Sequence, residues 1–94
     1  MKAHTAKDVK KFTDIPNVGP RIAHDFVTLG IKEPKGLVGK DPYVLYKKLC
    51  SLTKSRQDPC VLDTFMAVTD FMNGGMARDW WFYTQKRKKL YPDV

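Results

Sequence analysis

The stretch Ile15-Pro-Asn-Val-Gly-Pro-Arg-Ile-Ala23, followed by Phe26, Leu29 and Gly30, decides the fold predicted for this chain. Its centre, Pro16–Pro20, is rich in turn-forming residues and separates two segments in which apolar residues recur at helical spacing. These positions are Val9, Phe12 and Ile15 before the turn, and Ile22, Phe26 and Leu29 after it. The pattern predicts helices over about Ala6–Ile15 and Pro20–Leu29, joined by a tight loop.

The start of the second helix has the properties of an anion site. The first backbone N–H groups of a helix lack partners within the helix, and the aligned peptide dipoles place partial positive charge there. A phosphate can bind at such an end. The alternative is a plain helical turn in which Pro and Gly only interrupt the helices.

The same dipeptide predicts the starts of two later helices. Asp41-Pro42 and Asp58-Pro59 each place a capping carboxylate before a proline at the first helical position. They predict one helix from Pro42 to about Leu52 and another from Pro59 to Met72. In the connector before them, Pro34–Val38 predicts a short helical turn. We therefore expect one all-α domain over residues 1–94, a compact bundle of four to five short helices with a flexible lead-in at residues 1–7.

The tail, residues 76–94, combines aromatic and basic residues and is expected to pack on the bundle. One interpretation is that its aromatic rings stack on bases while its cations neutralise phosphates. The other, which we favour for the tryptophans, is that Trp80, Trp81 and Tyr83 close one end of the core. In that case the four cations Lys86-Arg87-Lys88-Lys89 stay solvated.

The first hairpin resembles the helix-hairpin-helix family of DNA-binding motifs. The matching positions are Ile15, Pro16, Val18, Gly19, Ala23, Phe26 and Gly30. The resemblance implies contact with the DNA backbone, without sequence specificity, through the amides around Val18 and Gly19 with help from Arg21. One departure is Asn17, which stands where the family has its first hairpin glycine. Asparagine tolerates a left-handed backbone, but its side chain adds bulk where a phosphate would approach.

A second, degenerate hairpin is predicted from repeated spacing. Val61, Leu62 and Phe65 repeat the spacing of Ile22, Ala23 and Phe26, with Leu52 as the counterpart of Ile15. This is similar to the tandem, SAM-like arrangement of many helix-hairpin-helix domains. Its loop, Thr53–Gln57, contains no glycine but offers Lys54 and Arg56 as side-chain contacts to phosphate.

A narrower resemblance covers most of residues 12–84. The hairpin, the run from Asp41 to Cys50 that leads into Gln57-Asp-Pro-Cys-Val-Leu-Asp63, and the late Trp80-Trp81 resemble small bacterial helix-hairpin-helix proteins of the pathogenicity-locus family, also labelled mitomycin-resistance proteins. The resemblance implies a bacterial, all-helical, DNA-associated protein. The family supplies no reaction to carry over.

Composition sets the remaining limits. The 94 residues have a formal net charge of +7, which favours a polyanionic partner, and 43% of them are hydrophobic, enough for one modest core. We expect no transmembrane segment or signal peptide, hence a cytoplasmic location. Cys50 and Cys60 lack metal-ligand spacing and are interpreted as packed thiols, with a redox pair or a metal site as the alternatives. No cofactor or metal is predicted.

The function predicted from these patterns is non-enzymatic DNA binding through Pro16, Asn17, Val18, Gly19, Arg21, Lys54 and Arg56. The alternative is a protein–protein adaptor on the same scaffold, anchored by Trp80-Trp81. An enzyme is least favoured, because the chain shows no acid–base pair and His24 beside Asp25 on a helix is no dyad. Cys60 is the one candidate nucleophile, since a helix start lowers a thiol's pKa. Oligomeric state and the form of DNA stay open.

Overall fold

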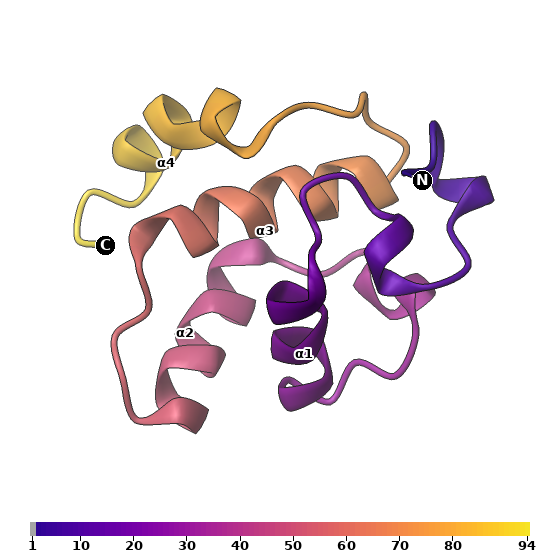
Figure 1. Ribbon diagram of the computed structural model, residues 1–94. Coiled ribbons are helices and arrows are strands. Elements are labelled where there is room, and N and C mark those ends of the chain that lie inside the picture. The colour runs from indigo at the N-terminus through magenta and orange to yellow at the C-terminus, as the bar shows by residue number, and fades with distance from the viewer. Residues whose placement is uncertain (1) are drawn as a thin grey trace.

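Three of the four α-helices begin at a proline, as the sequence predicts. The computed structural model describes residues 2–94, which are all-helical, and contains α1 (Pro20–Thr28), α2 (Pro42–Thr53), α3 (Pro59–Met72) and α4 (Thr84–Leu90) (Figure 1). Four short 3₁₀ turns, Ala6–Asp8, Phe12–Asp14, Pro34–Leu37 and Trp80–Tyr83, connect or precede them. The all-α bundle of short helices is thus confirmed.

The two Asp-Pro dipeptides act as the predicted helix caps. The Asp41 carboxylate accepts the N–H of Tyr43 at 2.8 Å at the start of α2. The Asp58 carboxylate accepts the N–H of Cys60 at 2.9 Å at the start of α3. Each cap satisfies a helix N–H that has no partner inside its helix.

The continuous helix expected over Ala6–Ile15 is wrong. This segment forms two 3₁₀ turns of three residues each, separated by extended backbone. The Asp14 carboxylate accepts the N–H groups of Lys10 and Lys11 at 3.0 and 3.1 Å, so these donors are withdrawn from a helix. An apolar residue at every third position also fits the three residues per turn of a 3₁₀ helix better than the 3.6 residues per turn of an α-helix.

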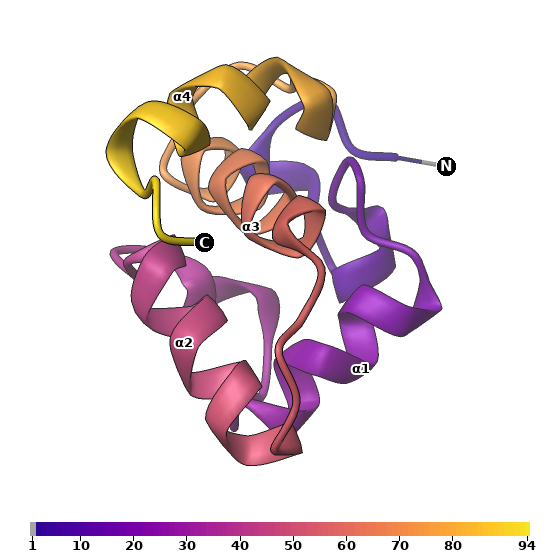
Figure 2. The same ribbon diagram turned by 90° about the vertical axis from the view of Figure 1, so that its left-hand side faces the viewer.

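Helix α3 is the centre of the molecule. In Figures 1 and 2, α4 lies along one side of α3, while α1 and α2 lie on its other side. Residues 61–69 are buried without interruption, so α3 is covered around its whole circumference along this stretch. Phe26 of α1 packs on Phe65 of α3 with ring centroids 5.4 Å apart. A helix surrounded in this way contributes most of the hydrophobic core.

The burial of residues along α2 shows which of its apolar side chains face the core. Leu45 and Leu49, four residues apart, are buried, whereas Val44 and Leu52 are 58% and 51% exposed. The predicted equivalence of Leu52 with Ile15 is therefore wrong, since Ile15 is fully buried. Leu52 continues the helical spacing of Leu45 and Leu49, but it lies in the last turn of α2, where it is exposed.

The tail is held on α3 by a buried ion pair. The Arg87 Nε donates to the Asp63 carboxylate at 2.9 Å, and the Thr84 hydroxyl donates to the same carboxylate at 2.8 Å. Asp63 is fully buried and Arg87 is 9% exposed. The expectation that all four cations from Lys86 to Lys89 stay solvated is wrong for Arg87. A carboxylate in the core must be paired, and α4 carries its partner.

The aromatic cluster divides between the core and the surface. Tyr83 is buried and donates its hydroxyl to Asp70 at 2.6 Å, and Trp80 is half-buried. Burial, reinforced by the Asp70 carboxylate, raises the pKa of the Tyr83 hydroxyl. Trp81 and Phe82 are 61% and 57% exposed. The expectation that these residues close one end of the core is confirmed for Tyr83 and in part for Trp80. It is wrong for Trp81.

None of the helices within residues 2–94 combines the length and the apolar character needed to cross a bilayer.

Replacing Arg87 by Leu is expected to lower the free energy of unfolding by about 3–5 kcal/mol, because the Asp63 carboxylate would stay buried without its counter-charge. The matched control is Lys88→Leu at the neighbouring, exposed position, where a change within about 0.5 kcal/mol is expected. Urea unfolding followed by circular dichroism measures both. Equal stabilities of the two variants would contradict the role given to the ion pair.

Candidate nucleic-acid interface

The hairpin turn, residues 16–19, lies between the 3₁₀ turn Phe12–Asp14 and the start of α1. The side chains of Ile15 and Val18 are fully buried on either side of its first half. The N–H of Val18 donates to the carbonyl of Ile15 at 3.1 Å, which closes the turn. Two buried apolar anchors and one internal hydrogen bond therefore fix the backbone of the loop.

Asn17 does two things in this turn. Its backbone adopts φ = 73°, the left-handed conformation expected for the residue that replaces a glycine. Its side-chain amide donates to the carbonyl of Arg78 at 2.7 Å and accepts the N–H of Trp80 at 3.1 Å. The side chain is thus bound to the tail, which a glycine cannot do, and the hairpin turn and the tail become one surface.

The lead-in also contacts the hairpin turn. The Lys2 ammonium donates to the carbonyl of Thr13 at 2.7 Å and to that of Val18. The N–H of Ala3 donates to the carbonyl of Asp14 at 2.7 Å. Lys2 therefore places a positive charge beside the turn, and sequence reasoning missed this residue. The basic character of the lead-in is the only signal in the sequence, because the contact spans eleven or more residues along the chain.

Three backbone N–H groups are free at the beginning of α1. Within the described part of the chain, no acceptor meets the N–H groups of Gly19, Arg21 and Ile22, and Pro20 has none to offer. The amide of Val18, which the resemblance implies as a phosphate donor, is already used inside the turn. A Cβ built on Gly19 would meet no atom within 4 Å. The space on the Cβ side of Gly19 is therefore open.

The charges around Arg21 are mixed. Arg21 is exposed in the first turn of α1, and its charge acts on two carboxylates, those of Asp25 one turn later and of Asp58 at the start of α3. Burial nevertheless raises the pKa of Asp25 above its ordinary value of 3.8, and one of its oxygens is buried without a partner among residues 2–94. The two carboxylates weaken the positive field of Arg21 toward an anion.

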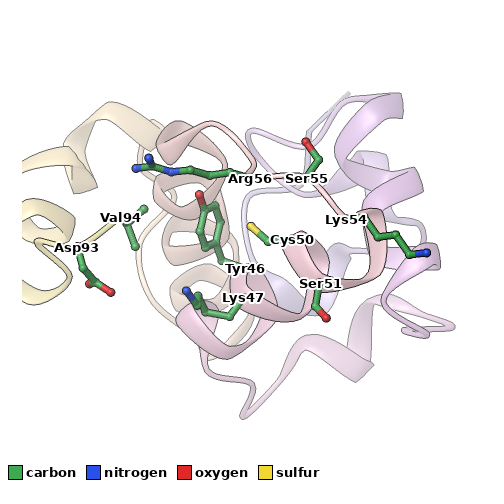
Figure 3. A pocket seen from close by; sticks show the side chains of 9 residues that line it. All are labelled: Tyr46, Lys47, Cys50, Ser51, Lys54, Ser55, Arg56, Asp93 and Val94. Carbon is green, nitrogen blue, oxygen red and sulfur yellow. The ribbon is translucent and has the colours of Figure 1, made fainter.

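Lys54 and Arg56 lie on the loop between α2 and α3, apart from the hairpin turn in both views (Figures 1 and 2). Both are exposed, and Lys54 adopts φ = 52° at the end of α2. They border an open hollow of about 620 Å³ together with Tyr46, Lys47 and Cys50. In Figure 3 the Arg56 side chain extends toward Val94, whereas that of Lys54 extends the other way. The structure does not bring these two cations to one point.

The start of α3 is chemically unlike the start of α1. The carboxylate of Asp58 occupies it, and hydrogen bonds from Cys60 hold the pKa of that carboxyl below 3.8. A phosphate approaching this helix end would meet a negative charge. Cys60 is half-buried, and burial together with Asp58 raises the pKa of its thiol. The dipole effect predicted for Cys60 is thus outweighed, and a raised pKa makes the thiol less reactive.

The fold and the hairpin turn define an all-helical protein with a basic surface, and comparison with known proteins identifies its family. Residues 5–89 match the model of the pathogenicity locus family (Cdd1), and the chain belongs to that family. It is 41% identical over 86 residues to the mitomycin resistance protein McrB of Streptomyces lavendulae. The aligned region covers 92% of this chain and 82% of that protein. No solved structure matches the chain.

Replacing Asn17 by Gly is expected to release the tail from the hairpin turn. The glycine suits φ = 73°, but the N–H of Trp80 loses its acceptor, so its hydrogen exchange is expected to accelerate at least tenfold. NMR exchange measures this, with the Leu29 amide of α1 as an internal control that stays protected. Unchanged exchange at Trp80 would show that Asn17 does not hold the tail.

Replacing Asp25 by Asn is expected to stabilise the protein at neutral pH. A raised pKa in the folded state favours the protonated form, so this contribution to stability is present below pH 3.8 and is lost as pH rises through the folded-state pKa. The variant avoids that loss, and its advantage should disappear in acid. Thermal unfolding across this pH range tests the prediction, which a pH-independent difference would contradict.

Proposed function

We propose that this protein is a non-enzymatic module that binds the DNA backbone without sequence specificity, through a helix-hairpin-helix site formed by the hairpin turn and the start of α1. The free N–H groups of Gly19, Arg21 and Ile22 carry the proposal. They belong to neighbouring positions at the positive end of a nine-residue helix, where a phosphate oxygen can accept such donors.

Nearby cations support binding of a phosphate at this point. The exposed Arg21 guanidinium can add a charge-assisted hydrogen bond to a bound phosphate. The Lys2 ammonium is bonded to the carbonyl of Val18 in the same turn, and the chain as a whole carries a net charge of +7. DNA as the ligand implies a cytoplasmic location.

The second loop plays a smaller role in this proposal than the sequence pattern suggests. Lys54 and Arg56 contribute charge from a separate site, and the Asp58 carboxylate at the start of α3 excludes a second backbone cradle. One cradle with a few surrounding cations corresponds to weak binding, on the order of 10⁻⁴–10⁻⁶ M at physiological salt. The name of the Streptomyces relative states a resistance phenotype and adds no molecular activity.

The sharpest test of the cradle is Gly19→Ala. Gly19 has φ = −98° and ψ = −174°, an extended backbone that alanine adopts freely, and its Cβ would meet no protein atom within 4 Å. The added methyl group would stand in the path of the phosphate. We expect the affinity for a short fluorescent duplex, measured by anisotropy, to fall about tenfold while its salt dependence stays the same. Unchanged affinity would contradict the cradle.

The charge contribution is tested by Arg21→Glu. We expect weaker binding to every duplex sequence alike and a shallower dependence of affinity on salt, because a contact that releases a counterion is lost. The matched control is Lys32→Glu, which makes the same change of charge beyond the opposite end of α1. If both variants bind equally, the effect belongs to net charge and not to the hairpin turn.

The second candidate function, a protein–protein adaptor, is favoured by one observation. Trp81 and Phe82 are exposed next to each other, which is unusual for rings of this size. Light scattering over a range of protein concentrations tests self-association through this face. A monomer whose only measured ligand is DNA would argue against the adaptor.

A further inference from the structure

The tail presents aromatic rings to solvent from a rigid support. Trp81 is 61% exposed, and its ring is nearly perpendicular to that of the half-buried Trp80, with ring centroids 5.6 Å apart. The adjacent Phe82 is 57% exposed. The turn Trp80–Tyr83 that carries them packs on α3, and Tyr83 and Thr84 are bonded to Asp70 and Asp63 of that helix. The backbone that carries these exposed rings is therefore held on α3.

The side chain of Asn17 joins these rings to the hairpin turn. Asn17 bonds to the backbone of Arg78 and Trp80, which flank Asp79 at the entry to the aromatic turn. The free N–H groups at the start of α1 follow Asn17 by only a few residues along the chain. The hairpin turn thus contacts the entry to the aromatic turn directly.

The charges around the rings suit a polyanion. The Arg78 guanidinium lies over the ring of Phe82, 4.2 Å from its centre. Lys86, Lys88 and Lys89 are exposed on α4, which follows directly. Within residues 76–89 the only carboxylate is that of Asp79. Aromatic faces flanked by cations are the combination that binds bases and neutralises the phosphates next to them.

We propose that the exposed ring of Trp81 forms a stacking platform for an unpaired nucleobase, with Phe82 and the Arg78 guanidinium that covers it at its side. The DNA preferred by this protein is then one in which an unpaired base adjoins the strand whose phosphate occupies the hairpin turn, as at a flap, gap or frayed end. This inference rests on the proposed function of the hairpin turn and specifies its substrate class. An intact duplex stacks its bases on each other and leaves no free face for the rings, whereas an unpaired base has one.

The test compares three labelled DNA probes of equal length: a complete duplex, the same duplex with a short thymidine flap, and a single strand. Wild-type protein is expected to bind the flapped duplex about tenfold or more tightly than the complete duplex. Because the chain has two tryptophans, the Trp80→Phe variant reports Trp81 alone. Its fluorescence should be quenched by the flapped duplex and the single strand but not by the complete duplex.

Trp81→Ala is expected to abolish the preference for the flap while leaving the affinity for the complete duplex unchanged. The matched control is Leu90→Ala, which removes a large apolar side chain that is 53% exposed on α4 and should keep the preference. If wild-type protein binds all duplexes equally and Gly19→Ala still weakens that binding, the stacking inference is overturned and the proposed function stands. If no DNA binds, both are overturned.

One further outcome would assign the rings to a protein contact. Trp81 fluorescence that changes with protein concentration in the absence of DNA would mean that the aromatic face meets a second copy of the chain, and it would overturn the stacking platform. Concentration-independent fluorescence, together with quenching by the unpaired probes, is the result that the proposal requires.

Discussion

A carboxylate buried inside the central helix constrains the rest of the molecule. Asp63 lies in a stretch of α3 that is covered on all sides, so its charge must be compensated within the protein. Arg87 and Thr84 provide the compensation, and both belong to α4. The tail must therefore cross α3, which in turn fixes the aromatic turn just before α4. The position of the exposed rings follows from the need to pair one charge.

The starts of α1 and α3 show how the residue before a helix changes the chemistry of similar backbone. Helices α1 and α3 both begin with proline and both present free N–H groups by geometry. In α3 the Asp58 side chain uses that end as a cap. In α1 the preceding residue is Gly19, which has no side chain and leaves the end open. The start of α3 is therefore stabilised by a side-chain cap, whereas the start of α1 has none.

Local signals in the sequence determined much of the fold. The Asp-Pro caps, the turn at residues 16–19 and the glycines after α1 and α3 act on neighbouring backbone, so α1, α2 and α3 were predicted to within about two residues. The left-handed backbone of Asn17 was likewise predicted from the turn residues around it. The helix predicted before the hairpin was wrong because the Asp14 side chain competes for backbone donors, which apolar spacing does not reveal. The free amides could be inferred from the motif, but the use of the Val18 amide could not.

The sequence by itself determined where α1, α2 and α3 begin, that the chain is all-helical and basic, and where the tight turn before α1 lies. Only the tertiary structure decided which polar side chains pair across the chain. Arg87 reads as one of four equal cations, Lys2 as part of a lead-in, and Asn17 as an imperfect glycine, until folding brings each to a partner distant in sequence. The same holds for Trp81, whose neighbours Trp80 and Tyr83 take the inward positions. Local preferences act over one helical turn, whereas charge pairing and burial depend on contacts that exist only once α3 is surrounded.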